Sequence, residues 1–300
     1  MTSAHPSTVQ KNPGNDPIQA IQTVAVVGAG QMGHGIAQVM ACADKSVLFY
    51  DSNAEALQKG QDAIAASLQK LNRKGKISDE ALEKAVARIV PVHDLAALCD
   101  ADLAIEAIVE LESAKTALFQ SLDAFLPPKA LLASNTSSIS ITRLAASTHR
   151  APQVIGMHFM NPVALMQLVE IIRGAQTNDA TYQCIASLTA ELGKTGVMSR
   201  DFPGFISNRV LMPLINEAIF ALFEGVGSAA DIDAVMKLGM NHPMGPLQLA
   251  DFIGLDTCLS IMTVLMDGFQ DARFRPCPLL KQYVDAGYLG KKTGRGFFEY

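Results

Sequence analysis

A glycine-rich turn between two strand-like segments constrains the fold of this chain more than any other feature of its sequence. Residues 22–27 (QTVAVV) are typical of a buried strand, and Gly28-Ala-Gly30-Gln-Met-Gly33 follows as a G-x-G-x-x-G turn before a helical run. A second strand at 46–50 (SVLFY) leads into Asp51. Strand, turn, helix and strand in this order predict a βαβ unit, and in that context the turn indicates a dinucleotide site.

Each residue of this proposed site has a specific physical function. Gly28 permits the tight turn, Gly30 lets the backbone approach a pyrophosphate, and Gly33 allows the helix to pack closely on the strand. The N-terminus of the helix presents free N–H groups and the positive end of its dipole to the phosphates. Asp51 can accept hydrogen bonds from ribose hydroxyls and would repel a 2′-phosphate. Because no Lys or Arg follows it closely, NAD is favoured over NADP. The alternative is a glycine-rich turn that binds no ligand.

The next part of the chain alternates between strand-like and helical segments. Helical runs at 54–74 and 79–89 predict a helical hairpin inserted in the sheet domain. Strand-like runs then return, mostly with helical runs between them, at 102–108, 130–134, 153–158, 167–172 and 195–199. This alternation predicts the α/β class, with a doubly wound, mostly parallel Rossmann-type sheet.

The character of the chain changes after Asp201-Phe-Pro-Gly204, where helical segments separated by Gly and Pro predict an all-helical domain. We therefore expect a flexible tail at 1–20, an NAD-binding Rossmann domain at 21–200 and a helical domain at 201–300. The tail is polar and holds no Arg, so it resembles neither a secretory signal nor a mitochondrial presequence.

Composition and charge exclude several classes of function. The net charge of −5 argues against a nucleic-acid-binding protein. Five cysteines without a CxxC pair predict reduced thiols rather than disulfides or a metal site, and hence a cytoplasmic location. The longest apolar helical stretch, 205–223, argues against a membrane span because it contains Asn208, Arg209, Asn216 and Glu217.

A histidine and a carboxylate are the strongest catalytic candidates. Glu170 lies in the apolar segment 167–172, where an unpaired buried charge would cost on the order of several kcal/mol. His158 ends the preceding strand, and consecutive strands are usually neighbours. A carboxylate on one imidazole nitrogen raises the basicity of the other, as the oxidation of an alcohol requires. A catalytic dyad and a structural His–Glu pair are equally compatible with these residues alone.

Two polar patches favour the catalytic interpretation. Ser134-Asn-Thr-Ser-Ser138 follows a strand at the carboxyl edge, where open α/β sheets bind their ligands. Such runs also occur in ordinary turns and helix caps. Asn208 lies one turn into the helix after Pro203-Gly204, where an apolar face is expected, although a packing role would also explain it.

Together these segments resemble the 3-hydroxyacyl-CoA dehydrogenase family, in its short-chain bacterial 3-hydroxybutyryl-CoA branch. The resemblance runs from about residue 21 to the C-terminus, with a longer tail than usual and His34 where a small or amide residue is common. The matching stretches are Val27-Gly-Ala-Gly-Gln-Met-Gly-His-Gly35, Glu106-Ala-Ile-Val-Glu110, Ser134-Asn-Thr-Ser-Ser138, Gly156-Met-His-Phe-Met-Asn-Pro162, Leu168-Val-Glu170, Asp201-Phe-Pro-Gly-Phe-Ile-Ser-Asn-Arg209, Pro243-Met-Gly-Pro246 and Gly290-Lys-Lys-Thr-Gly-Arg-Gly-Phe297.

The resemblance implies an oxidoreductase of fatty acid metabolism that moves a hydride reversibly between C3 of a (3S)-3-hydroxyacyl-CoA and NAD. It implies that His158 is the catalytic base, that Glu170 orients it, and that Ser137 and Asn208 lie at the substrate oxygens and near the nicotinamide. It also implies a homodimer formed through the C-terminal helical domain. With the glycine-rich turn included, the cofactor-binding residues expected are Gly28, Gly30, Gln31, Met32, Gly33, Asp51, Glu110, Lys115, Asn135, Ser137 and Lys292.

The resemblance further implies that the acyl-CoA substrate is bound by Ser67 and Lys74, together with Ser137. Lys70, Arg73 and Lys74 share one helix face, and this local cationic surface suits the phosphates of CoA. A solvated helix face is the alternative, which we favour for Lys70 and Arg73.

Two other functions remain open. One is a related NAD-dependent hydroxy-acid or sugar-acid dehydrogenase, against which the matches at the two CoA positions argue. The other is a non-catalytic, crystallin-like structural protein, which would have no need of a complete catalytic set. No metal site is expected.

Overall fold

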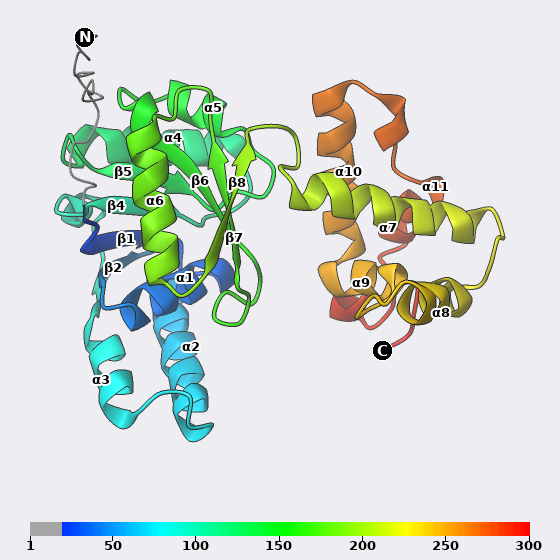
Figure 1. Cartoon of the computed structure of the whole chain (residues 1–300), viewed down its shortest axis with the longest axis horizontal. Coiled ribbons are helices and arrows are strands. Elements are labelled where there is room, and N and C mark those ends of the chain that lie inside the picture. The colour runs from blue at the N-terminus through cyan, green and yellow to red at the C-terminus, as the bar shows by residue number, and fades with distance from the viewer. Residues whose placement is uncertain (1–19) are drawn as a thin grey trace, which may run out of the picture.

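The computed structural model describes residues 20–300, so nearly all of the predicted tail at 1–20 lies outside the described residues. An eight-stranded sheet and a separate group of helices make up the molecule (Figure 1). The strand order is β3-β2-β1-β4-β5-β6-β7-β8. The strands are β1 (Thr23–Val27), β2 (Ser46–Tyr50), β3 (Ile89–Val92), β4 (Leu103–Glu106), β5 (Leu131–Ser134), β6 (Val154–Phe159), β7 (Leu168–Arg173) and β8 (Thr195–Arg200).

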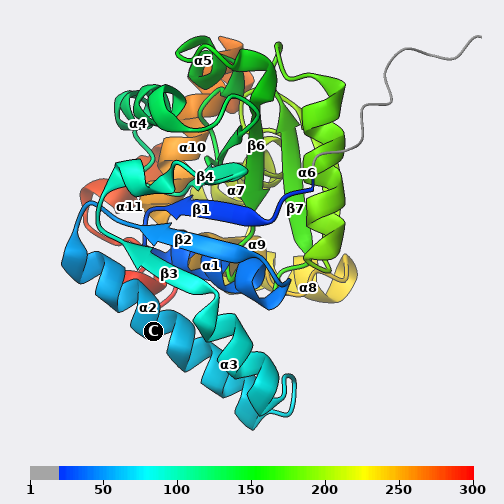
Figure 2. The same cartoon turned by 90° about the vertical axis from the view of Figure 1, so that its left-hand side faces the viewer.

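All neighbouring strands run parallel except β6 and β7, which are antiparallel. Helices cover both faces of the sheet, as expected for strands that are apolar on both sides (Figure 2). One face packs on α1 (Gln31–Cys42), α2 (Ala54–Arg73) and α6 (Asp179–Glu191). The other packs on α4 (Glu112–Phe125) and α5 (Ile141–Ala146). The predicted doubly wound, mostly parallel α/β sheet is confirmed.

The predicted hairpin consists of α2 and α3 (Asp79–Ala87), which extend away from the sheet (Figure 1). Asn53 caps α2 by accepting hydrogen bonds from two backbone N–H groups, and Ser78 caps α3. The predicted second helix ran two residues too far, since Ile89 already begins β3. That edge strand was not predicted because its four residues, IVPV, contain a proline, which only an edge position tolerates.

Beyond Arg200 the described chain is helical. The helices are α7 (Ser207–Phe223), α8 (Ala229–Gly239), α9 (Pro246–Ile253), α10 (Leu255–Phe269) and α11 (Pro278–Asp285). They enclose a core of their own, which includes Met212, Ile219 and Leu265. In residues 20–300 no single helix is long and apolar enough to cross a membrane; α9 and α10 pass such a test only as a pair, bent by 98°.

Candidate active site

The antiparallel pairing of β6 and β7 brings the two catalytic candidates together. His158 and Glu170 are direct partners in the register of these strands. The imidazole Nδ1 lies 2.9 Å from Glu170 Oε2, and both residues are buried. The contact that the sequence predicted between imidazole and carboxylate is therefore present, in the antiparallel part of the sheet.

Glu170 also receives three hydrogen bonds from the start of α7. The backbone N–H groups of Ile206 and Ser207 donate to Oε1, each at 3.0 Å, and the Ser207 hydroxyl donates to Oε2 at 2.6 Å. Burial acts to raise the pKa of Glu170, but the hydrogen bonds from His158 and Ser207 outweigh it and lower this pKa. Ser207 was missed by the sequence analysis, because its partner lies 37 residues away in another element.

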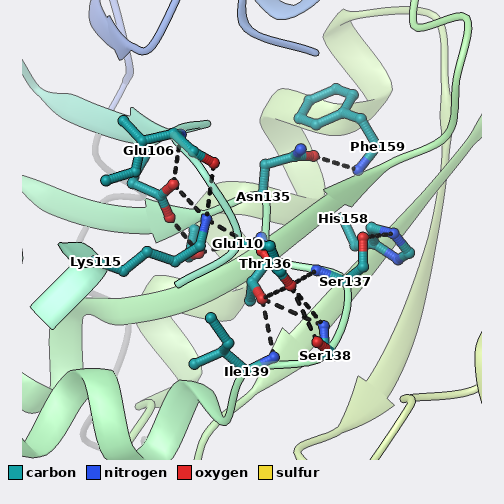
Figure 3. Close-up of polar contacts among 12 residues, drawn as sticks. Glu106, Glu110, Lys115, Asn135, Thr136, Ser137, Ser138, Ile139, His158 and Phe159 are labelled. Carbon is teal, nitrogen blue, oxygen red and sulfur yellow. Dashed lines mark hydrogen bonds and ion pairs between the residues drawn. The ribbon is translucent and has the colours of Figure 1, made fainter. Parts of the chain in front are cut away.

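Ser137 and Asn208 complete a connected polar chain around the histidine. Ser137 Oγ lies 3.1 Å from the imidazole Nε2, a contact drawn in Figure 3. Asn208 Nδ2 donates to the Ser137 carbonyl at 3.1 Å. The Phe205 ring packs near the imidazole, with 6.1 Å between ring centroids. The structure thus brings all four predicted catalytic residues into one cluster. The imidazole Nε2, which does not face Glu170, contacts the Ser137 hydroxyl. A substrate alcohol would present the same kind of group to this nitrogen.

The loop after β5 is organised by Glu110. One carboxylate oxygen of Glu110 accepts from the Thr136 hydroxyl at 2.5 Å, the Ser137 N–H at 2.8 Å and the Ser138 N–H at 3.1 Å (Figure 3). Burial acts to raise the pKa of Glu110, but the charge of Lys115 and these donors lower it. Asn135, on the same loop, accepts from the Phe159 N–H at 2.9 Å and so ties the loop to β6.

Lys115 lies beneath this loop and not on the open surface. Its ammonium is almost fully buried and pairs with Glu106 at 2.5 Å and with Glu110 at 3.3 Å (Figure 3). Glu106 is fully buried and also accepts from the Ser134 hydroxyl at 2.6 Å. Burial raises the pKa of Glu106 even though Lys115 and the hydrogen bonds act to lower it. These contacts join β4, α4 and β5 under Ser137.

The glycines of the glycine-rich turn are of two kinds, those that the packing of the protein requires and one that faces open space. Gly28 has a φ of +105°, and a Cβ there would lie 2.6 Å from the Ala107 carbonyl oxygen. A Cβ at Gly33 would overlap the carbonyl of Gly28, so these two glycines are required by the fold. A Cβ at Gly30 would meet nothing within 4 Å, so no protein atom explains that glycine. The N–H groups at Gln31, Met32 and Gly33 begin α1 without a side-chain cap, which fits a bound pyrophosphate.

Asp51 lies at the end of β2 beside this turn. One of its oxygens accepts from the Ala29 N–H at 2.7 Å and the other from the Asn53 N–H at 2.9 Å. A carboxylate has about four acceptor positions, so Asp51 keeps capacity for ribose hydroxyls. The Gln31 side chain donates to Asn161 at 3.2 Å, on the loop that follows His158.

The remaining predicted residues lie away from this cluster. Ser67 is half-buried on α2, and Lys74 is exposed at the end of that helix. The Lys292 ammonium is in the helical domain, where it pairs with both carboxylate oxygens of Asp256 at 2.5 and 2.7 Å. Within residues 20–300 no group of three or more potential ligands is arranged to hold a metal ion.

Comparison with known proteins identifies the family. A model of the 3-hydroxyacyl-CoA dehydrogenase NAD binding domain matches residues 23–202, and a model of the C-terminal domain of the same enzymes matches 204–300. The chain is 55% identical to a 3-hydroxybutyryl-CoA dehydrogenase of Bradyrhizobium diazoefficiens, over 93% of this chain and 96% of that protein. It is 43% identical to a 3-hydroxyadipyl-CoA dehydrogenase of Escherichia coli, over 93% of this chain and 59% of that protein.

A solved structure agrees with these sequence matches. The crystal structure of an (S)-3-hydroxybutyryl-CoA dehydrogenase from Ralstonia eutropha has a TM-score of 0.92 and 47% identity, and the match covers 94% of this chain and 99% of that one. The glycine-rich turn, the sheet and the helical C-terminal domain are thus accounted for by one family. The chain belongs to the 3-hydroxyacyl-CoA dehydrogenase family and is an NAD-dependent oxidoreductase.

Proposed function

We propose that the chain catalyses the reversible oxidation of (3S)-3-hydroxybutyryl-CoA to acetoacetyl-CoA, with His158 as the base. One observation carries this proposal: the imidazole is held at Nδ1 by Glu170 while Nε2 contacts the Ser137 hydroxyl, 3.1 Å away. A carboxylate at Nδ1 fixes the tautomer in which Nε2 can accept a proton. The short acyl chain is proposed from the names of the two 3-hydroxybutyryl-CoA dehydrogenases that resemble this chain.

In this mechanism the substrate hydroxyl loses its proton to His158 Nε2 as the C3 hydride departs, and the C–O bond becomes a carbonyl. Bound NAD supplies the hydride acceptor. Glu170 stabilises the imidazolium that forms, and the Ser137 hydroxyl and the Asn208 amide orient the substrate oxygens. In the reverse direction His158 returns the proton to the oxygen.

The cofactor is proposed to lie along the turn and the loop after β5. The free N–H groups of the α1 N-terminus bind the pyrophosphate and Asp51 binds the adenosine ribose. Glu110 and Asn135 shape the loop that carries Ser137, and buried Lys115 acts through Glu110. We propose that Lys292 reaches the cofactor by exchanging its partner Asp256 for it.

CoA is proposed to bind along α2. Ser67 and Lys74 are seven residues apart, two helical turns, so they share one face of the helix. The predicted division into domains at residue 200 and the cytoplasmic location stay proposals. A homodimer through the helical domain is supported by apolar side chains exposed there, among them Val226, Leu238 and Met240.

The test of the dyad compares His158→Ala and Glu170→Gln with wild type, in both reaction directions. A general base contributes roughly 10²–10⁴-fold, so His158→Ala should lower kcat by about that factor while NADH affinity stays near wild type. The two losses should be strongly non-additive, because both residues serve one proton transfer. Wild-type turnover in His158→Ala protein shown to be folded by its melting curve would exclude the histidine as the base.

Chain length is tested by kcat/KM for a series of 3-ketoacyl-CoA substrates. Acetoacetyl-CoA should be reduced with the highest kcat/KM in that series. The Escherichia coli relative named for 3-hydroxyadipyl-CoA makes a dicarboxylic acyl chain the specific competitor. A higher kcat/KM with the six-carbon dicarboxylic substrate would replace the short-chain assignment.

A further inference from the structure

Within residues 20–300, only His158 and Ser207 hydrogen-bond the Glu170 carboxylate through their side chains. Its Oγ donates at 2.6 Å to Oε2, the same oxygen that bonds the imidazole Nδ1 at 2.9 Å. The other oxygen, Oε1, is held by the N–H groups of Ile206 and Ser207, which no side-chain substitution removes. The hydroxyl of Ser207 is therefore the donor that a substitution can delete without touching the dyad itself.

We propose that Ser207 is a positioning residue that sets how strongly Glu170 holds the proton of the His158 imidazolium. This inference rests on the proposed function of His158 as the base. A hydroxyl bonded to Oε2 draws negative charge away from the imidazole, because one oxygen is shared between two donors. The two N–H groups bonded to Oε1 keep Oε2 facing Nδ1 even when the hydroxyl is removed. A reversible dehydrogenase needs an imidazole that both accepts and returns a proton, and Ser207 acts on the carboxylate that stabilises the protonated ring.

Few other charged or polar groups near the His158–Glu170 dyad could change how strongly Glu170 holds the imidazolium proton. On β8, the residue paired with Glu170 is the apolar Val197. On α7, the guanidinium of Arg209 packs over the Phe274 ring, 4.6 Å from its centroid. On the side of β5, Ser137 contacts Nε2, and Glu106 farther along is paired with Lys115. The Phe205 ring covers the imidazole from the start of the helical domain.

The test uses three substitutions at one position. Ser207→Ala deletes the hydroxyl, and Ser207→Thr and Ser207→Val form a matched pair of nearly equal shape that differ in that hydroxyl. The measurement is kcat/KM against pH for oxidation of 3-hydroxybutyryl-CoA, which reports groups of the free enzyme. NMR titration of the His158 ring gives a second readout that does not depend on turnover. Melting curves establish that each variant is folded.

Without the hydroxyl, Glu170 should hold the imidazolium proton more tightly. The acidic limb of the profile for Ser207→Ala and Ser207→Val should therefore move upward by roughly half to one pH unit. On the acidic limb this is a loss of about three- to tenfold in kcat/KM, while the plateau at higher pH stays close to wild type. The NMR midpoint should move in the same direction. Ser207→Thr, which keeps a hydroxyl, should have the same pH profile as wild type.

Two outcomes would overturn the proposal. An unchanged acidic limb of the pH profile in folded Ser207→Ala and Ser207→Val would show that the hydroxyl does not alter how Glu170 holds the imidazolium proton. A lower plateau with an unmoved limb, seen equally in Ser207→Thr, shows that Ser207 only packs. His158→Ala, measured beside them, separates the two levels of inference. If His158→Ala is inactive while the acidic limbs of the Ser207 variants do not move, only the positioning role of Ser207 is refuted. If His158→Ala turns over normally, the proposal that His158 is the base is refuted as well.

Discussion

Replacing Lys115 by methionine should leave a buried carboxylate without its cationic partner. Glu106 is fully buried, and Lys115 is its only ion-pair partner within residues 20–300. Removing one member of a buried pair costs about 3–5 kcal/mol, because the remaining charge stays out of water. For a sheet domain of this size, that corresponds to a fall in melting temperature of roughly 6–20 °C.

The pH dependence of this loss has a definite sign. Burial already raises the pKa of Glu106 in the folded protein, and loss of Lys115 should raise it further. A carboxyl whose folded pKa is raised binds its proton more tightly in the folded state, so stability falls as pH rises from the unfolded value toward the folded one. The melting temperature of Lys115→Met should therefore increase when the buffer is changed from pH 8 to pH 5.5, more than that of wild type.

The assay is a set of melting curves for wild type, Lys115→Met, Glu106→Gln and the double variant at both pH values. The double variant removes the buried charge, and its amide can still bond the Ser134 hydroxyl and the Ile108 N–H that now bond Glu106. It should recover most of the lost stability, because an uncharged pair costs little to bury. A double variant no more stable than Lys115→Met, or a Lys115→Met protein within about 2 °C of wild type, would refute the reasoning.

Three further predictions concern the ligand sites. Asp51→Ala should raise KM for NADH roughly tenfold, equivalent to about 1.4 kcal/mol of binding free energy. It should also lower the ratio of kcat/KM for NADH to that for NADPH, which steady-state kinetics with both cofactors would measure. Lys74→Ala should raise KM for acetoacetyl-CoA about two- to fivefold at 10 mM salt with kcat unchanged, and the effect should shrink at 0.2 M salt. Gly30→Ala should weaken NADH binding in titrations but keep the wild-type melting temperature, whereas Gly33→Ala should destabilise the fold, and a large loss of stability in Gly30→Ala would contradict a ligand-facing role.

The alternation of strand-like and helical segments was sufficient to predict the sheet apart from one edge strand, and the charged Glu170 in an apolar segment was sufficient to predict its contact with His158. A carboxylate buried in an apolar strand needs a polar partner, and His158 on the preceding strand is that partner. The same reasoning could not find β3, because the proline within its four residues argues against a strand unless that strand lies at the edge of a sheet. It also could not find Ser207, whose hydrogen bond depends on how the first turn of α7 meets the sheet. The burial of Lys115 was equally hidden, since a lysine on a helix is usually exposed.

The hydrogen bonds that α7 donates to Glu170 also affect when the site can form during synthesis and folding of the chain. The sheet ends at Arg200, whereas the three donors to Glu170 belong to Ile206 and Ser207, at the start of the helix that follows the sheet in the sequence. Until the start of α7 has folded against the sheet, Glu170 lacks all three of these donors. We expect the nascent sheet to leave this carboxylate open to water until α7 docks. The pair of His158 and Glu170 therefore acquires its full set of hydrogen bonds only when the helix that begins at Ser207 packs against the sheet.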